Sequence, residues 1–418
     1  MNRYFKPIRI PCLFLFLLSG ISSISLAFPK GDIIGCNNRV LEIESPTGKG
    51  SVHPLAIAMW DFSWLERRWE GAGYEDWDKA LDELVERGYD AVRIDPYPHL
   101  LAADQTKVWE LLPEWSVQDW GAPARCRIQV QPNLNTFIRK CKERKIKVAL
   151  SAWFREDIDN IRLKLTTPES HVQIWKKTLE SIASEGLLDA ILYLDCNNEF
   201  PYWCPFLPSG FKRNSPEGLK WMRQIEEGLR HLYPEIPFTF SFVANEDETW
   251  LPQNVKSHDF LEIHVWMANY SDFYKKLNYN YERFDTKGYD RIQLNAESLY
   301  NSDKEYYQNS LKEGIQHIID LSKSSKLPVI TTECWGIVDY KDFPMLNWGW
   351  VKDLCTIGVE NATKSGRWVA IATSNFCGPQ FKGMWNDIAY HRKLTSMIKS
   401  STFDQSFNDL KIVKRLNY

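Results

Sequence analysis

The sequence lacks several short patterns that mark large classes of protein. It has no Cys-x-x-Cys pair, so zinc-ribbon spacing is absent. No His-x-His pair follows the apolar run at residues 55–60, and the eight histidines are dispersed, which disfavours a metal-dependent hydrolase. No Gly-x-Gly-x-x-Gly turn follows that run either, which disfavours a dinucleotide-binding sheet. We therefore expect neither a metal nor a cofactor.

The chain also has little excess charge and no tract of basic residues. Its 418 residues carry a formal net charge of −3, and 44% are hydrophobic, which is an ordinary globular composition. Mild acidity without a basic tract argues against nucleic acid as a partner. The composition leaves the oligomeric state open.

Beyond the N-terminus, no hydrophobic run is long enough to span a membrane. The N-terminus has three basic residues in its first nine positions, then an apolar run from Ile10 that leads to small residues around Ala27. This order is typical of a secretory signal peptide, and the run is too short for a spanning helix. We predict a signal peptide over residues 1–27, cleaved near Ala27, and one exported domain over residues 28–418. An N-terminal anchor helix remains the alternative.

Removal of residues 1–27 has two consequences for the mature chain. It deletes three bases and no acid, which changes the formal net charge from −3 to −6. It also leaves eight of the nine cysteines. Export permits disulfides but a chain of this size does not require them. Most of these cysteines fall in predicted strands or helices, so we expect several to be buried thiols and leave their pairing open.

Short apolar runs alternate with amphipathic helical patterns along the rest of the chain. The predicted strands cover residues 55–60, 90–94, 147–153, 189–195, 238–243, 260–266, 328–332 and 367–373. The predicted helices cover residues 75–87, 133–144, 169–185, 216–232, 305–322, 346–361 and 388–398. Strands that are apolar throughout are typical of a parallel sheet covered on both faces. This series predicts an α/β fold, a (β/α)8 TIM barrel, with a doubly wound open sheet as the alternative.

A barrel prediction fixes where functional groups should lie, because the βα loops at the C-terminal face build the site. The mature chain is longer than the ~250 residues of a typical barrel. The surplus falls mainly in residues 96–130, 200–214 and 267–304, so we predict long βα loops at that face. Residues 28–50 and 401–418 are predicted to be peripheral extensions.

Two of the predicted strands end in a glutamate. The run Ile-Leu-Tyr-Leu-Asp-Cys-Asn-Asn-Glu ends at Glu199 after the fourth strand, and Pro-Val-Ile-Thr-Thr-Glu ends at Glu333 after the seventh. Retaining glycoside hydrolysis requires two carboxylates, one to donate a proton to the leaving oxygen and one to attack the sugar carbon. A second Asn-Glu pair at Glu246, just after strand five, shows that the dipeptide alone is weak evidence. A surface glutamate in a loop is the alternative for Glu199.

Two other strand ends carry polar groups. Arg93 ends the second strand and shares a face with Asp95 by period-two alternation. It could keep a nucleophilic carboxylate ionised or form a structural Arg–Asp pair, and the sequence does not decide between them. His264 and Trp266 share a face at the end of the sixth strand, where the histidine could contact substrate, contact the nucleophile or be hydrogen-bonded in the core. Glu262, one step deeper, is interpreted as structural.

Together these strand ends resemble glycoside hydrolase clan A, closest to the cellulase-like, family 5 type. The resemblance covers nearly the whole mature chain and rests on the strand-two arginine, Asn-Glu after strand four, His-x-aromatic after strand six and Glu-x-Trp-Gly after strand seven. It implies that Glu199 is the acid/base and Glu333 the nucleophile. It also implies that Asn198, Arg93 and His264 assist them.

Aromatic residues at the strand ends are candidate substrate-binding residues, because a flat ring can stack on a sugar. They are Trp60, Trp153, Trp266, Trp335 and Phe376. The family usually has tyrosine where Trp266 stands, often has histidine near the end of strand three, and commonly has a stacking tryptophan where Phe376 stands. These departures leave the sugar subsite open.

The sequence thus predicts a secreted, periplasmic or extracellular, retaining β-glycoside hydrolase that cleaves a β-linked poly- or oligosaccharide by double displacement. The alternatives are a non-catalytic carbohydrate-binding protein on the same barrel, a transglycosylase and a metal-dependent hydrolase. The identity of the sugar, its linkage and endo or exo action stay undetermined.

Overall fold

The computed structural model describes residues 52–114, 122, 124–245, 250–279, 286–338, 340 and 347–418. The predicted signal peptide over residues 1–27, the predicted extension over 28–50 and Glu246 lie outside these ranges. All statements about the structure below refer to the described residues.

The strands form one large parallel sheet and one small hairpin. They are β1 (Leu55–Ala58), β2 (Ala91–Ile94), β3 (Val108–Leu111), β4 (Cys126–Gln129), β5 (Lys147–Ser151), β6 (Ile191–Asp195), β7 (Phe238–Thr239), β8 (Phe242–Val243), β9 (Leu261–Trp266), β10 (Val329–Thr331), β11 (Cys334–Trp335) and β12 (Trp368–Ala372). Of the strands in the described ranges, only β3 and β4, which pair antiparallel, lie outside the large sheet.

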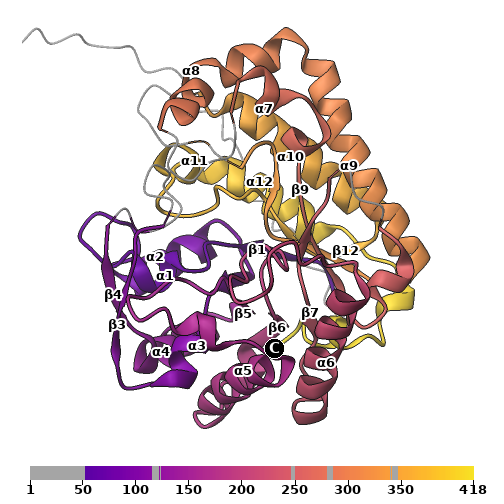
Figure 1. Cartoon of the computed structure of the whole chain (residues 1–418). Helices are drawn as coiled ribbons and strands as arrows, with labels where there is room; N and C mark the ends of the chain where they lie inside the picture. The colour runs from indigo at the N-terminus through magenta and orange to yellow at the C-terminus, as the bar shows by residue number, and fades with distance from the viewer. Residues whose placement is uncertain are drawn as a thin grey trace, which may run out of the picture. The chain divides into compact units, whose positions relative to one another are not determined.

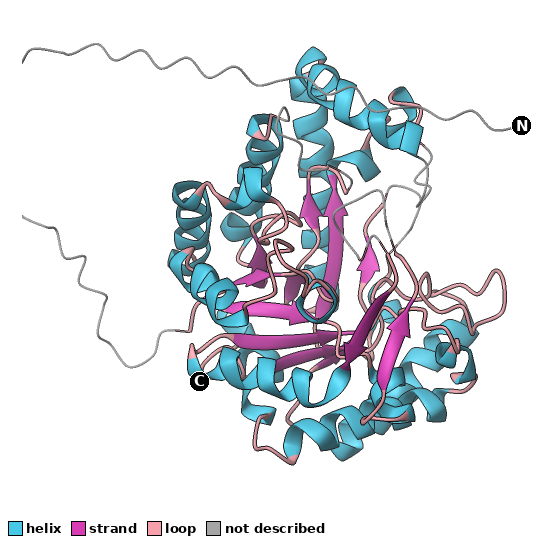
Figure 2. Ribbon diagram, turned by 90° about the vertical axis from the view of Figure 1, so that its left-hand side faces the viewer, coloured by secondary structure: helices cyan, strands magenta, loops and turns pink. Residues whose placement is uncertain are grey.

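The large sheet curls into a barrel. From β1 it runs through β2, β5 and β6 to β7 in one direction, and through β12 and β10 to β9 in the other. The short strands β7 and β8 are two halves of one predicted strand: β7 pairs with β6, whereas β8 pairs with β9. The two ends of the sheet therefore meet, and the predicted (β/α)8 TIM barrel is confirmed. Figure 2 shows the strands in the interior with helices around them.

The helices follow the strands in alternation (Figure 1). They are α1 (Ser63–Glu66), α2 (Trp77–Glu86), α3 (Pro98–Ala103), α4 (Val130–Glu143), α5 (Pro168–Ala183), α6 (Pro216–Leu232), α7 (Phe273–Lys276), α8 (Thr286–Ser302), α9 (Lys304–Ser325), α10 (Gly349–Ser365), α11 (Lys382–Trp385), α12 (Ile388–Ser400) and α13 (Lys411–Lys414). Among the described residues, the connection from β8 to β9 has a 3-10 turn, Pro252–Val255, where the other barrel connections have a helix.

Local sequence explains where the helices begin and which face they bury. The Asp76 side chain accepts hydrogen bonds from the backbone N–H groups of Asp78 and Lys79 and so caps the start of α2. The apolar stripe of α2 is buried at Ala80 and Leu81, among others. Pro168 and Pro216 each occupy the first position of a helix, where a missing N–H costs no hydrogen bond.

The predicted long loops contain more regular structure than expected. The segment 96–130 holds α3 and the β3–β4 hairpin, and the segment 267–304 holds α7 and α8. The description of these segments as loops is therefore wrong in part. The reason is weak patterning: β3 is only partly buried, and Leu294 on α8 is 78% exposed, so neither element has a strong apolar period.

Two further expectations concern the cysteines and the membrane. The seven cysteines in the described ranges are all free thiols, and six of them are buried, which confirms the expectation for several of them. No described helix combines the length and the apolar character that crossing a membrane requires.

Candidate active site

The barrel brings both predicted glutamates to the same end of the sheet. Glu199 follows β6 and Glu333 follows β10, and each lies at the C-terminal end of its strand. The backbone N–H of Glu199 donates to the Ser241 hydroxyl at 2.8 Å. Glu199 has a φ of 47°, a left-handed conformation that is uncommon for a residue other than glycine. Such strained positions gather at functional sites, because the surrounding structure must hold them in place.

Arg93 joins three carboxylates at the centre of this end of the barrel. Its Nε and Nη2 donate to the two carboxylate oxygens of Asp61, both at 2.7 Å. Its Nη1 donates to Glu262 Oε1 at 2.8 Å and to Thr332 Oγ1 at 2.6 Å. Its Nη2 also donates to Glu333 Oε1 at 2.5 Å. All of these side chains are buried, so one guanidinium holds Glu333 in place.

Of the two alternatives that the sequence left open for Arg93, the structure shows its guanidinium bound to Glu333, whereas no pair with Asp95 forms. The carboxylate of Asp95 instead accepts the backbone N–H groups of Tyr97 and Trp153. Burial raises the pKa of Asp95 to about 8, which fits a carboxyl group that is not paired with a cation.

His264 links the two glutamates. Its Nδ1 lies 2.9 Å from Glu199 Oε1 and 3.6 Å from Glu333 Oε1. Burial alone would lower the pKa of His264, but the surrounding carboxylates of Glu333, Glu199 and Glu262 outweigh it and raise that pKa to about 10. The ring is therefore an imidazolium at neutral pH, and its Nδ1–H donates to Glu199.

Glu333 and Glu262, which lie near the two different ring nitrogens of His264, have different pKa values. Burial raises the pKa of Glu333 to about 7, and this effect exceeds the opposing attraction of His264 and Arg93. Burial also acts on Glu262, but the His264 ring, 3.8 Å away, and the charge of Arg93 lower the pKa of Glu262 to about 2. Glu262 is thus a permanent counterion, whereas Glu333 changes protonation near neutral pH.

The two glutamates are close enough to act on one bond. Three side-chain atoms lie within 4.8 Å of one another: a carboxylate oxygen of Glu199, a ring nitrogen of His264 and a carboxylate oxygen of Glu333. This spacing would also suit a metal ion, but the guanidinium of Arg93 already lies 2.5 Å from Glu333, and His264 would first have to lose a proton. The trio therefore fits proton transfer and nucleophilic attack better than metal binding.

Two residues near Glu199 complete its surroundings. Asn198 is fully buried, and neither its Oδ1 nor its Nδ2 has a hydrogen-bond partner among the described residues. An unsatisfied buried amide is costly, so a ligand hydroxyl is a natural partner for it. Trp203 donates its indole N–H to Glu199 Oε2 at 3.2 Å. Both oxygens of Glu199 are therefore hydrogen-bonded, one by His264 and one by Trp203.

The sequence interpretation missed Trp203 and Asp61. The Trp203 ring packs against Trp153 with 5.1 Å between ring centroids, and the Trp153 indole N–H donates to Asp61. A chain of contacts thus runs from Glu199 through two tryptophans to Asp61. Asp61 was detectable in principle, since it follows the end of the first strand, whereas Trp203 lies in an irregular loop.

Four of the five predicted aromatic candidates are almost completely buried. Trp60, Trp266, Trp335 and Phe376 are each at most 2% exposed, whereas Trp153 and Trp203 line a cavity of about 200 Å³. The Trp335 indole N–H donates to the Ala372 carbonyl at 3.1 Å, so its ring packs in the core and offers no face to a sugar. Trp153 is the candidate best placed to contact a substrate.

Trp60, Trp266 and Phe376 pack against other rings. The centroid of Trp266 lies 6.0 Å from that of His264, and its indole N–H has no hydrogen-bond partner among the described residues. The rings of Trp60 and Phe376 both contact Phe381, at 4.9 and 5.1 Å. Their predicted part in substrate binding stays a prediction.

Comparison with known proteins gives a consistent result. Residues 57–399 match the family model described as sugar-binding cellulase-like. A solved structure from Parabacteroides distasonis, described as a candidate glycoside hydrolase, is 48% identical, with a TM-score of 0.84 over 87% of this chain and all 100% of that chain. No curated protein matched the chain.

More distant solved structures were also found. An endo-1,4-β-D-mannanase from Thermotoga petrophila is 12% identical, with a TM-score of 0.47 over 76% of this chain and 87% of that one. A family 5 glycoside hydrolase variant from Streptomyces cattleya, in complex with Manβ1-4GlcNAc, is 11% identical, with a TM-score of 0.45 over 77% of this chain and 70% of that one.

Proposed function

Because this chain belongs to the sugar-binding cellulase-like family, we propose that it is a retaining β-glycoside hydrolase that acts on a β-linked poly- or oligosaccharide. One observation carries the proposal: Glu199 and Glu333 come from different strands and place carboxylate oxygens within 4.8 Å of one another. Retaining enzymes hold their two carboxyl groups ~5–5.5 Å apart, whereas inverting enzymes need a wider gap for a water molecule.

We assign each carboxyl group a distinct role in the first step, and the geometry supports this assignment. Glu199 donates its proton to the glycosidic oxygen as the bond to the anomeric carbon breaks. Glu333 attacks that carbon to form a glycosyl–enzyme ester. Arg93 holds Glu333 Oε1, so Oε2 is the oxygen we propose to attack. His264 and Trp203 then stabilise the carboxylate that Glu199 becomes.

The second step reverses the roles. Glu199, now ionised, removes a proton from water, the water oxygen attacks the anomeric carbon, and the ester to Glu333 breaks. Two inversions at one carbon leave the anomeric configuration unchanged. Asn198, whose buried amide has no partner among the residues that the structure describes, is proposed to hydrogen-bond the sugar 2-hydroxyl during both steps.

The proposal is tested with a panel of β-linked gluco-, manno- and xylo-oligosaccharides and aryl β-glycosides. We expect one of these to be cleaved with retention, seen by proton NMR of the first product formed. Glu333→Gln should abolish turnover, and Glu199→Gln should reduce it ~10²- to 10⁴-fold, with unchanged thermal unfolding. Azide should restore product formation in Glu199→Ala. An inverted first product, or a fully active Glu333→Gln, would contradict the mechanism.

One observation favours a second candidate, carbohydrate binding without hydrolysis. Glu333 is only 1% exposed and Glu199 8%, so both carboxyl groups are almost closed off from solvent. Saccharide binding in calorimetry, together with no cleavage of any member of the panel by the wild type, would favour this candidate over the enzyme.

We further propose that residues 1–27 direct export. The basic start followed by an apolar run and small residues supports this. N-terminal sequencing of the protein recovered outside the cytoplasm should begin at or next to Phe28. Recovery of the intact N-terminus in the membrane fraction would favour the anchor alternative.

A further inference from the structure

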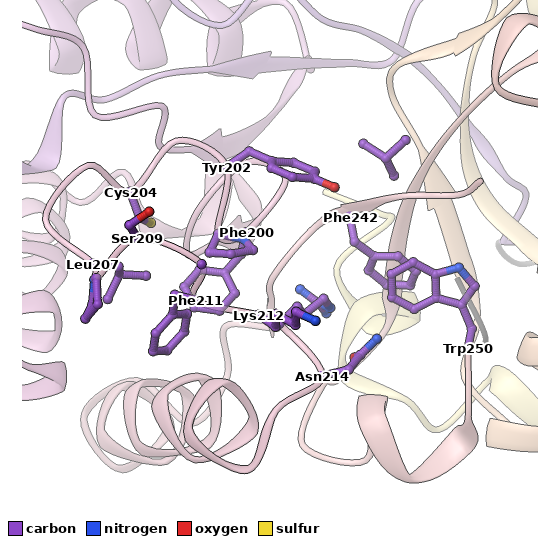
Figure 3. A pocket seen from close by; sticks show the side chains of 15 residues that line it. Phe200, Tyr202, Cys204, Leu207, Ser209, Phe211, Lys212, Asn214, Phe242 and Trp250 are labelled. Atoms are coloured by element: carbon purple, nitrogen blue, oxygen red, sulfur yellow. The ribbon is translucent and has the colours of Figure 1, made fainter. Parts of the chain in front are cut away.

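A separate cleft lies beside the loop that carries Glu199 (Figure 3). Its volume is about 570 Å³, which is within the range of sites that bind small molecules. Phe200 and Tyr202 form part of its wall, and Phe200 directly follows Glu199 in the chain. Adjacent Cα atoms are about 3.8 Å apart, so the wall of the cleft begins next to the proposed acid.

One wall of the cleft is an aromatic platform. The rings of Phe242 and Trp250 lie 4.1 Å apart between centroids with an angle of 31° between their planes. Figure 3 shows these two rings together at one end of the cleft. The Arg213 guanidinium lies 4.5 Å from the centroid of Phe242 and helps to fix that ring. Phe242 is only 2% exposed and so supports Trp250, whose partly exposed ring offers a flat apolar surface without a large loss of conformational freedom on binding.

Polar groups without partners accompany the platform. The Trp250 indole N–H and the Asn214 Oδ1 are buried, and within the described ranges neither has a hydrogen-bond partner. Leaving such groups unsatisfied costs about 1–3 kcal/mol each, and a bound ligand would remove that cost. Lys212, which is exposed, adds further donors to the same cleft. Flat apolar area combined with single donors and acceptors suits the face and hydroxyl groups of a sugar ring.

The position of the cleft indicates which part of a substrate it would hold. Its described lining comes from the segment 200–214, from β8 and from Trp250, which lie beside the fourth and fifth barrel strands. None of these lining residues comes from β10 to β12, around Glu333. Since Glu199 protonates the leaving oxygen, a cleft on its side of the site faces the leaving group.

We propose that this cleft binds sugar units on the leaving-group side of the scissile bond, so that the substrate is a β-linked saccharide chain extending beyond the cleaved bond. This inference rests on the proposed glycosidase function. It narrows the substrate class, because an enzyme specific for small leaving groups would have no use for an aromatic platform of this size beside its acid.

The test compares long and short leaving groups. Trp250→Ala removes the platform and Trp250→Phe keeps a ring but removes the N–H. Trp69→Ala, at an exposed tryptophan that does not line the cleft, is the matched control. Substrates are cellohexaose and mannohexaose against para-nitrophenyl β-cellobioside and β-mannobioside. We expect Trp250→Ala to lower kcat/KM for a hexasaccharide about tenfold or more, because one aromatic anchor is lost. The kcat/KM for the aryl glycosides should change less than about twofold. Trp69→Ala should change neither.

A binding measurement separates this inference from the proposed function. Glu333→Gln should bind the hexasaccharides in calorimetry, and adding Trp250→Ala should raise Kd about tenfold, with Trp250→Phe between them. Equal losses on both substrate types, or an unchanged Kd, would overturn the cleft proposal. If the wild type cleaves nothing but the Kd still depends on Trp250, the glycosidase function fails while the saccharide cleft stands.

Discussion

At the scale of single residues, the charge arrangement around Glu333 explains its properties. The cations of Arg93 and His264 meet the carboxyl groups of Asp61, Glu262 and Glu333 in a buried space, with Glu199 close by. Anions exceed cations there, and burial disfavours the excess charge. A proton is therefore retained in the cluster near neutral pH. The strand-end position made Glu333 a candidate from the sequence, but its partners come from distant strands and were only partly predictable.

The raised pKa of Glu333 leads to a pH prediction. The proposed nucleophile, Glu333, must be ionised to act, and burial raises its pKa to about 7. We expect log kcat/KM to rise with unit slope as the pH increases towards 7 and then to level off. His264→Gln should move this acid limb to higher pH, because the imidazolium lowers the pKa of Glu333. A wild-type limb centred near 4.5 would contradict the prediction.

Trp203 permits a test of the proposed acid. Its N–H donates to Glu199 Oε2, so it would stabilise the carboxylate that forms when Glu199 gives up its proton. Trp203→Phe should therefore lower kcat/KM about tenfold or more, as loss of one hydrogen bond to a charged group predicts. Trp153→Phe, which removes a donor to Asp61 instead, should have a smaller effect. Equal losses in both variants would indicate a general loss of structure.

At the scale of elements, most barrel strands and helices were predictable because their patterns are strong. Strand β9 and helix α6 lie within one residue of their predicted bounds. The exceptions either have a weak apolar pattern or result from contacts between strands that are distant in the sequence. The predicted strand 238–243 divides into β7 and β8, because each half pairs with a different neighbour to close the barrel. The helix α8 has too irregular an apolar pattern to detect.

Helix α10 packs closely on β11, the strand that follows Glu333. This close packing can be tested at Gly358. A Cβ added to Gly358 would lie 2.2 Å from the Trp335 ring, which the barrel holds in place. Gly358→Ala should therefore destabilise the protein by ~1–3 kcal/mol or more, despite the better helix propensity of alanine. Gly349→Ala, where the new Cβ would meet only the flexible Asn347 side chain, is the control. Urea unfolding of both variants measures the difference, and equal stabilities would contradict the packing argument.

At the scale of the whole molecule, Arg93 connects distant parts of the barrel. It joins Asp61, after β1, to Glu262 in β9 and to Glu333 after β10. These residues are far apart in the chain, so their contacts form only when the sheet has closed. The resemblance to the cellulase-like family is confirmed at this scale, since the match spans residues 57–399.

Removal of this connection should destabilise the whole domain. Arg93→Met leaves buried carboxylates without their cation, and breaking a buried ion pair costs ~3–5 kcal/mol. Arg125→Met removes an exposed arginine that pairs with Glu110 at 3.1 Å, and it should change stability by less than about 1 kcal/mol. Guanidinium unfolding measures both. A small effect of Arg93→Met would show that the cluster relaxes or takes up protons.

The sequence by itself determined the approximate positions of the barrel strands, the (β/α)8 architecture and the placement of Glu199 and Glu333 at the ends of two strands. Apolar periodicity and strand order are local properties, and parallel strands in a barrel must place their ends at one face. Only the tertiary structure decided which groups meet there: that Arg93 binds Asp61 rather than Asp95, that Trp203 reaches Glu199, and that Trp335 packs inward. The physical reason is that such contacts depend on barrel closure and loop paths, which bring together residues that no local pattern relates.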